Sequence, residues 1–145
     1  MNPPSGQIIT APTSLLKHVK YDHAWQITRT RCEGLSWKPE LAPSPALFAQ
    51  YLRDWKHSSE KRWWSEYERR FLEELETPEK KEALRELWRL AQKGLTVVLS
   101  CFCVDLAFCH RSLAGLYLKN KGLTVSEFDA NSINQGYPSQ LSLFN

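Results

Sequence analysis

The sequence contains no long apolar run. None of its hydrophobic stretches approaches the roughly 20 residues needed to cross a bilayer. Residues 1–6 show no basic region followed by an apolar core, so we expect no secretion signal. A cytoplasmic protein with no membrane partner is therefore expected. Hydrophobic residues still make up 42% of the 145 positions, which is enough for the core of one domain.

The chain also has little excess of either charge. Its formal net charge is only +3, from 19 Lys and Arg against 16 Asp and Glu. Residues 1–58 carry seven basic against four acidic side chains, residues 59–94 carry nine of each, and residues 95–145 carry three of each. This balance disfavours electrostatic recognition of duplex DNA by the body of the protein. The charged central region is typical of solvated helical faces.

No internal repeat is present, and strand and helix patterns alternate along the chain. β-Branched or apolar runs predict strands at 7–11, 24–28 and 96–100, with a fourth at 123–125. Helical spacing predicts helices at 45–55, 59–76, 77–93 and 112–118, and residues 32–44 are expected to form an irregular loop. Ser44-Pro45 and Thr77-Pro78 are typical helix starts, and Gly94 is a typical stop.

This order predicts a small α/β layered domain. We expect a largely parallel sheet of three to four strands flanked by helices, followed by a flexible C-terminal tail. The expected boundaries are 7–127 for the domain, 128–139 for a polar linker and 140–145 for a terminal peptide.

Three of the four cysteines fall within nine residues, and this is the strongest chemical signal inside the domain. Cys101, Cys103 and Cys109 lie in a loop between a buried strand and a buried helix, whereas Cys32 stands apart. In a reducing compartment such clustering indicates metal or thiol chemistry more than a disulfide framework. The alternative for Cys101 and Cys103 is that they are small buried hydrophobic residues at the end of a strand.

Cys109 is the candidate nucleophile. It should lie at a helix start next to His110 and Arg111, which would favour its thiolate. His110 or Asp105 could then carry the proton. The loop lacks the Cys-x5-Arg cradle of tyrosine phosphatases, because both Cys101 and Cys103 stand too far from Arg111.

Arginines indicate an anion site at the same place. Arg111 and the backbone N–H groups around Ser112 would meet an anion at the helix start. Arg29 and Arg31 follow the second predicted strand, so they would emerge at the same edge if that strand runs parallel. A phosphate or a carboxylate is the expected ligand.

A metal site is the alternative use of this loop. Cys101, Cys103, Cys109 and His110 are four possible ligands for zinc or iron. The usual Cys-x2-Cys spacing is absent, however, and the adjacent Cys109 and His110 are awkward ligands for one tetrahedral ion.

Three segments of the chain resemble the domain of unknown function 488 family. These are Ile27-Thr28-Arg29 at a strand end, Leu41-Ala42-Pro43-Ser44 before a Trp- and Tyr-rich helical stretch, and Phe108-Cys109-His110-Arg111 after a strand that leads to Cys101. The resemblance covers roughly residues 7–127. It implies a compact α/β domain with a site around the Cys-His-Arg loop, and it implies no particular activity.

One position departs from the family pattern. Many members carry an acidic residue two positions after the first cysteine, where this chain has Cys103. Asp105 is the acidic residue nearest to that position in this chain.

The C-terminal residues Gln140-Leu141-Ser142-Leu143-Phe144 resemble the peptide by which bacterial replication and repair proteins bind the sliding clamp. Leu143 and Phe144 would be the buried anchors, Leu141 would add contact area, and Gln140 would make rim hydrogen bonds. A loose tail would give micromolar affinity. The alternative is that this segment packs on its own domain as a strand.

Three functional hypotheses follow. The first is a replication- or repair-associated enzyme that acts on DNA or nucleotides and is recruited by the bacterial DNA polymerase sliding clamp. The second is a non-catalytic clamp-binding adaptor or a phage or plasmid inhibitor, and the third is a metal-binding module. The sequence leaves the reaction, the cofactor and the oligomeric state open.

Overall fold

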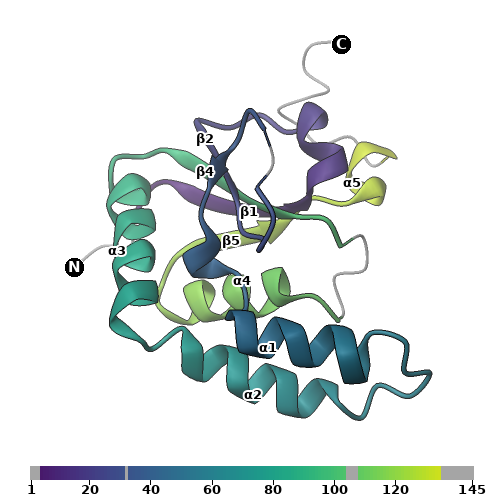
Figure 1. Ribbon diagram of the computed structural model, residues 1–145. Helices are drawn as coiled ribbons and strands as arrows, with labels where there is room; N and C mark the ends of the chain where they lie inside the picture. The colour runs from purple at the N-terminus through teal and green to yellow at the C-terminus, as the bar shows by residue number, and fades with distance from the viewer. Residues whose placement is uncertain (1–3, 32, 104–107, 135–145) are drawn as a thin grey trace.

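The computed structural model describes residues 4–31, 33–103 and 108–134. Five parallel strands form one sheet in the order β3-β2-β4-β1-β5 (Figure 1). The strands are β1 (Gln7–Pro12), β2 (His23–Gln26), β3 (Ser36–Trp37), β4 (Thr96–Cys101) and β5 (Thr124–Glu127). The predicted α/β class and parallel sheet are confirmed, with one strand more than the upper expectation.

The described residues also form five α-helices and three short helices of other types. The α-helices are α1 (Pro45–Gln50), α2 (Trp64–Glu74), α3 (Pro78–Gln92), α4 (His110–Asn120) and α5 (Ala130–Asn134). The 3-10 helices are η1 (Thr13–His18) and η2 (Pro39–Leu41), and η3 (Tyr51–Trp55) is a π-helix. None of the helices in the described parts of the chain is both long and apolar enough to cross a bilayer.

The two faces of the sheet contribute to different cores. Along β1, Ile8 belongs to the larger core with α2, α3 and α4, whereas Ile9 belongs to a smaller core with Leu16 and Phe128. This alternation is the ordinary consequence of strand geometry. The layer that α2, α3 and α4 form therefore lies on one face of the sheet, with α1 and α2 at its outer edge (Figure 1), and η1 packs on the other face.

Local sequence signals account for the helix boundaries. The Ser44 Oγ atom accepts a hydrogen bond from the Leu47 N–H at 3.2 Å, so Ser44 caps α1 as predicted. Ser44 also binds Glu74 through both its N–H and its hydroxyl, which ties the start of α1 to the end of α2. Gly94 has a φ of 82° just after α3, the left-handed conformation that favours glycine at a helix end.

Two elements differ from the sequence prediction. β3 lies within the segment expected to be an irregular loop, and its two residues pair with Trp25 and Gln26 of β2. The segment expected to be a linker from residue 128 begins with the buried Phe128 and continues into α5. Residues 135–145, which include the terminal peptide, lie outside the described residues.

Candidate functional site: a cysteine cluster beneath an aromatic cavity

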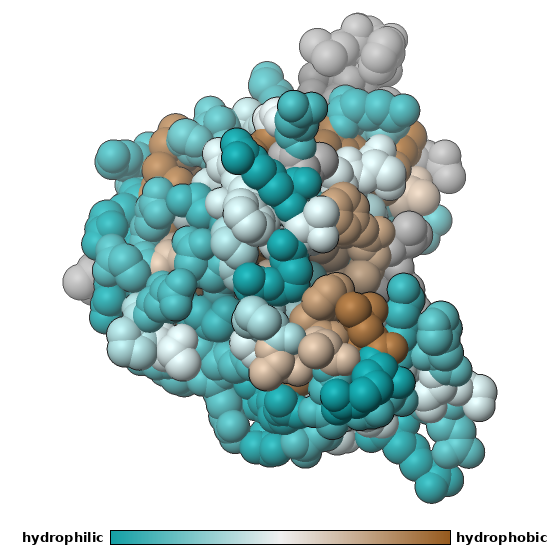
Figure 2. Space-filling view, viewed as in Figure 1, coloured by the Kyte–Doolittle hydropathy of each residue, from teal (hydrophilic) through white to brown (hydrophobic). Residues whose placement is uncertain are grey.

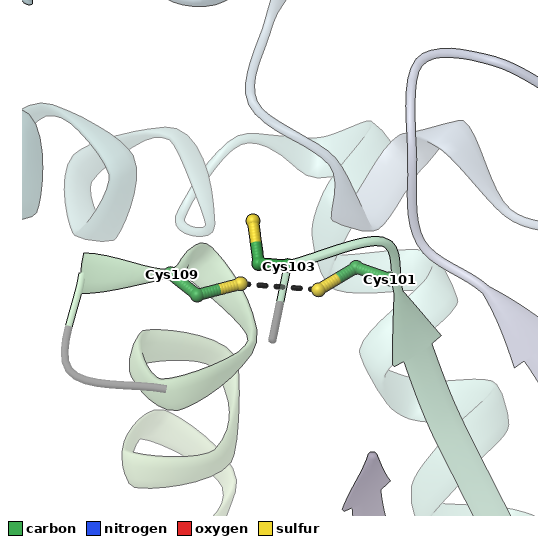
Figure 3. A group of neighbouring side chains, drawn as sticks. All are labelled: Cys101, Cys103 and Cys109. Atoms are coloured by element: carbon green, nitrogen blue, oxygen red, sulfur yellow. Dashed lines mark hydrogen bonds between the residues drawn. The ribbon is translucent and has the colours of Figure 1, made fainter. Parts of the chain in front are cut away.

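The cysteine cluster lies where β4 ends and α4 begins. Both elements place backbone groups at the carboxyl edge of the parallel sheet, where ligands of such sheets commonly bind. Cys101 is the last residue of β4, and Cys109 immediately precedes α4. Their side chains point toward one another, and their Sγ atoms are 3.0 Å apart (Figure 3).

Cys103 completes the group of sulfur atoms. The Sγ atoms of Cys101, Cys103 and Cys109 all lie within 4.8 Å of one another. Cys101 and Cys109 are buried, whereas Cys103 is exposed. In Figure 3 the Cys103 sulfur is directed away from the line that joins the other two. The structure therefore contains a buried pair with a third, accessible thiol beside it.

Arg111 is the cation of this site, and it is completely buried. Its Nη1 atom donates to Cys101 Sγ at 3.2 Å, to Cys109 Sγ at 3.6 Å and to the Cys103 carbonyl oxygen. Burial acts to lower the pKa of Arg111, but the Glu127 carboxylate and the sulfur atoms outweigh it and raise that pKa above its usual range. Arg111 is therefore a permanent positive charge under the sulfur pair.

Glu127 fixes the orientation of this guanidinium. Its two carboxylate oxygens accept from Arg111 Nε at 3.2 Å and Nη2 at 2.8 Å, a bidentate arrangement. Thr10 donates to the same carboxylate at 2.5 Å. Gly115 permits the close approach of α4 to the sheet that this contact needs, because a Cβ there would lie 3.3 Å from Val125.

His110 is oriented by a backbone carbonyl. Its Nε2 atom lies 2.5 Å from the Ile27 carbonyl oxygen, and a carbonyl can only accept, so Nε2 carries a hydrogen. In the neutral ring Nδ1 is then the acceptor, and it faces Cys109 Sγ at 3.9 Å. The ring is buried and packs edge-on against Phe71.

The surroundings of Cys109 bear on the expectation that it is a thiolate. Its hydrogen bonds to Cys101 and Cys103, together with burial, raise the pKa of the Cys109 thiol far above its usual range. These surroundings oppose a thiolate at Cys109. Arg111 lies closer to Cys101, so a negative charge on the pair is best placed on the Cys101 sulfur.

The predicted anion site of three arginines is not assembled. The donors of Arg111 face Glu127 and the sulfur atoms, Arg31 is exposed and does not line the cavity, and only Arg29 does. Ser112 donates to the Cys109 carbonyl oxygen at 2.7 Å and belongs to the first turn of α4. Asp105 lies outside the described residues.

A cavity of about 250 Å³ opens above the buried sulfur pair. Cys101, Cys109 and His110 contribute to its lining, and aromatic side chains from α1, η3 and α2 form much of the rest. Figure 2 shows hydrophobic residues gathered in front of α1 and just higher in the view, on the face that the view presents. The helical spacing of these aromatic residues predicts helices, and it does not indicate that they line a cavity.

The set of possible metal ligands in the structure differs from the set expected from the sequence. Among the described residues that could hold a metal ion, the group consists of the three cysteines, and His110 does not belong to it. The Nε2 atom of His110 is engaged by Ile27, and Nδ1 is only near Cys109. A three-sulfur site with an open fourth position is the form that remains.

A family model described as the active DUF488-N3 subclade, DUF488-N3a, matches residues 13–122. This match covers most of the chain, so the protein belongs to the domain of unknown function 488 family. The matched range includes the cysteine cluster and Arg111 but ends before Glu127. No curated protein and no solved structure matches the chain.

Proposed function

We propose that the protein is a thiol-dependent enzyme whose reacting group is the Cys101–Cys109 pair. The observation that carries this proposal is the 3.0 Å separation of the two sulfur atoms, with the Arg111 guanidinium in contact with both. A purely structural pair of cysteines needs no buried, carboxylate-oriented cation beneath it. The family description, which calls the matched subclade active, agrees with this function.

The pair shares one proton in the proposed resting state. Cys109 donates its S–H to a Cys101 thiolate, and Arg111, which also binds the Glu127 carboxylate, donates to the same sulfur. His110 Nδ1 stands on the far side of Cys109 as the next acceptor. Cys101 is therefore the nucleophile, and Cys109 with His110 forms a path by which a proton reaches or leaves the site.

The proposed chemistry is nucleophilic displacement. The Cys101 sulfur forms a bond to an electrophilic centre of the substrate, and the bond from that centre to the leaving group breaks. The proton held by Cys109 passes to the leaving group. In the second step water attacks the same centre, the bond to sulfur breaks, and the water proton returns to the pair.

Alkylation with iodoacetamide at neutral pH, followed by peptide mass mapping, tests this proposal. Cys101 should be alkylated despite its burial, because the Arg111 guanidinium contacts its sulfur atom. Cys109→Ser should change the rate of that reaction, whereas Cys103→Ser should leave it unchanged. If Cys101 is not alkylated in the folded protein and Cys109→Ser has no effect, the proposal is wrong.

The three-sulfur group favours a metal-binding module as the second candidate. All three sulfur atoms are near enough to share one ion, and a thiolate-rich set suits zinc. Metal analysis of the purified chain decides between the two. One tightly held ion per chain, lost in Cys103→Ser, would support the metal module and contradict a free thiol pair.

We also propose that the terminal peptide recruits this site to the bacterial sliding clamp, so that it acts on DNA or nucleotides at replication or repair sites. The support is the sequence Gln140-Leu141-Ser142-Leu143-Phe144. Two adjacent apolar anchors on a polar segment suit capture in a preformed pocket.

A pull-down with purified bacterial sliding clamp tests the recruitment. The intact chain should bind, and a Leu143→Ala/Phe144→Ala variant should lose binding. Ser142→Ala is the matched control, because it changes a polar neighbour and keeps both anchors. Equal capture of all three chains would overturn clamp docking and leave the thiol proposal untouched.

A further inference from the structure

The cavity above the sulfur pair has a lining that the cysteine chemistry does not explain. Its described walls include five aromatic rings, from Phe48, Tyr51, Tyr67, Phe102 and Phe108. Tyr67 stacks on Phe71 with an interplanar angle of 5°, and Tyr51 meets Tyr67 edge to face at 6.1 Å. These rings are held in place by neighbours, so little ordering would be needed when a flat ligand binds.

Exposed apolar side chains lie among the lining residues. Phe102 is 55% exposed and Leu52 is 43% exposed, although both are large and hydrophobic. Neither exposure is required by the packing of the core. A ligand with an apolar face would cover them and recover the free energy that their exposure costs.

Apart from the Cys101 thiolate proposed above, the charged side chains in the described lining are positive. Arg29 and Lys56 are its cations, and no carboxylate is present among the described lining residues. The Arg29 guanidinium is fixed because its Nη1 atom donates to the carbonyl oxygens of Pro39 at 3.3 Å and Pro43 at 3.4 Å. Lys56 is exposed and can move. The ligand should therefore carry a negative group as well as a flat ring.

We infer that this cavity binds a mononucleotide, with its base against the aromatic rings and its phosphate near Arg29 and Lys56. This inference rests on the proposed function and names its substrate class. The volume of about 250 Å³ lies just below the roughly 300–1,000 Å³ of pockets for drug-sized ligands, which favours one nucleotide over a dinucleotide. The sulfur pair would then face the ligand from below.

Titration calorimetry on the intact wild-type chain tests this inference. The probes are the 5′-monophosphates of adenosine, guanosine, cytidine and uridine, with ribose 5-phosphate as the baseless control. At least one nucleotide should bind roughly tenfold or more tightly than ribose 5-phosphate, because stacking of one base contributes about 1–3 kcal/mol. Equal affinity for ribose 5-phosphate would overturn the aromatic part of the inference.

Surface variants test where the phosphate and the base of the nucleotide lie. Lys56→Gln should weaken nucleotide binding roughly twofold to fivefold, and Lys20→Gln, at another exposed lysine, should not. Phe102→Ala should weaken it roughly fivefold or more, whereas Tyr21→Ala, at an exposed aromatic residue that does not line the cavity, should not. If both test variants match their controls, the nucleotide lies elsewhere and the inference is wrong.

The failure of this inference is distinguishable from failure of the proposed function. Calorimetry needs no turnover, and alkylation needs no nucleotide. A reactive Cys101 without nucleotide binding at millimolar concentration would overturn only the substrate class. Nucleotide binding with ordinary thiols would overturn only the thiol enzyme. If both proposals hold, a bound nucleotide should slow alkylation of Cys101, and unchanged alkylation at saturation would place the ligand away from the sulfur pair.

Discussion

Two cationic side chains are buried in the part of the chain that the structure describes, and their surroundings differ in one decisive respect. Lys80 of α3 is 9% exposed, and its Nζ donates to the carbonyl oxygens of Glu40 at 2.6 Å and Ala42 at 2.8 Å. Arg111 of α4 is 0% exposed and contacts a carboxylate and two thiols. Lys80 therefore binds neutral groups that keep one charge state, whereas Arg111 binds sulfur atoms that can change theirs.

This difference separates a structural cation from a functional one. Lys80 holds the turn before α1 against α3. Burial lowers its pKa by more than the nearby carboxylates, Glu74 foremost, raise it. Arg111 keeps its charge through Glu127 and offers that charge to the Cys101–Cys109 pair. Burial of a charged side chain is thus a poor signal of function by itself, and the chemistry of its partners is a better one.

The largest expected effect comes from Arg111→Met. This change leaves the half-buried Glu127 carboxylate without its partner and should cost about 3 kcal/mol of unfolding free energy, the lower end for a broken buried ion pair. Urea unfolding measures the loss. The double variant Arg111→Met/Glu127→Gln removes the unpaired charge and should recover part of it, while Cys101 alkylation at neutral pH stays slow in both. Fast alkylation in the folded double variant would show that Arg111 does not activate the pair.

Lys80→Met should have the next largest effect. It leaves two carbonyl oxygens without their donor, which should cost about 1–3 kcal/mol. Because Lys80 does not touch the sulfur pair, the alkylation rate of Cys101 in the folded protein should equal that of the wild type. A fall in that rate as large as the one in the Arg111 variants would remove the distinction between the two cations.

The two sites should also respond to alkaline pH with opposite signs. The pKa of Lys80 is lowered in the folded state. Between that lowered pKa and the ordinary lysine pKa of about 10.4, unfolding takes up a proton at Lys80. In this pH window the contribution of Lys80 to stability therefore rises with pH. Cys109 has a raised folded pKa, so its contribution is fully present below about pH 8.5 and is lost as pH rises further.

Urea unfolding between neutral pH and pH 10 measures these slopes. Lys80→Met should show a steeper alkaline loss of stability than the wild type, because it removes the term that rises with pH. Cys109→Ala should show a shallower loss, because it removes the term that falls. Parallel curves for all three chains would contradict both assignments.

The smallest expected effect is that of Cys103→Ser. Cys103 is exposed, and replacement at such a position usually changes stability by no more than about 0.5 kcal/mol. The carbonyl oxygen that accepts from Arg111 is retained because it belongs to the backbone. Differential scanning calorimetry should therefore give nearly the wild-type transition. A large destabilisation would indicate that the Cys103 sulfur holds the site together, as a metal ligand would.

Much of the fold could be predicted because it depends on local patterns. The β-branched run at 96–100 predicts a buried strand, and Ser44-Pro45 predicts the start of α1; both agree with the structure. β3 could not be predicted, because two residues carry too little pattern. Its pairing with β2 depends on where the chain returns after Trp25 and Gln26.

The site was predicted only in part. The nearness of Cys101, Cys103 and Cys109 follows from their spacing around one loop. The direction of Arg111 does not, because its partner Glu127 comes from β5 at the sheet edge, 16 positions further along the chain. Strand order decides such a contact, and no local pattern encodes it. The sequence therefore predicts a three-arginine anion site at a place where the structure has the Arg111–Glu127 ion pair.

The π-helix η3 forms part of the cavity rim, and a π-turn can lose one residue and become an α-turn. The Lys56 N–H donates to the Tyr51 carbonyl oxygen at 2.7 Å, five positions earlier, so this turn holds one residue more than an α-turn. Each residue of an α-helix rotates those that follow by about 100°. Deletion of a single codon here would swing Lys56 around the helix axis while β4, α4 and the sulfur atoms kept their register. Relatives could thus diverge in the ligands they admit by gaining or losing one residue, with the reactive centre inherited intact.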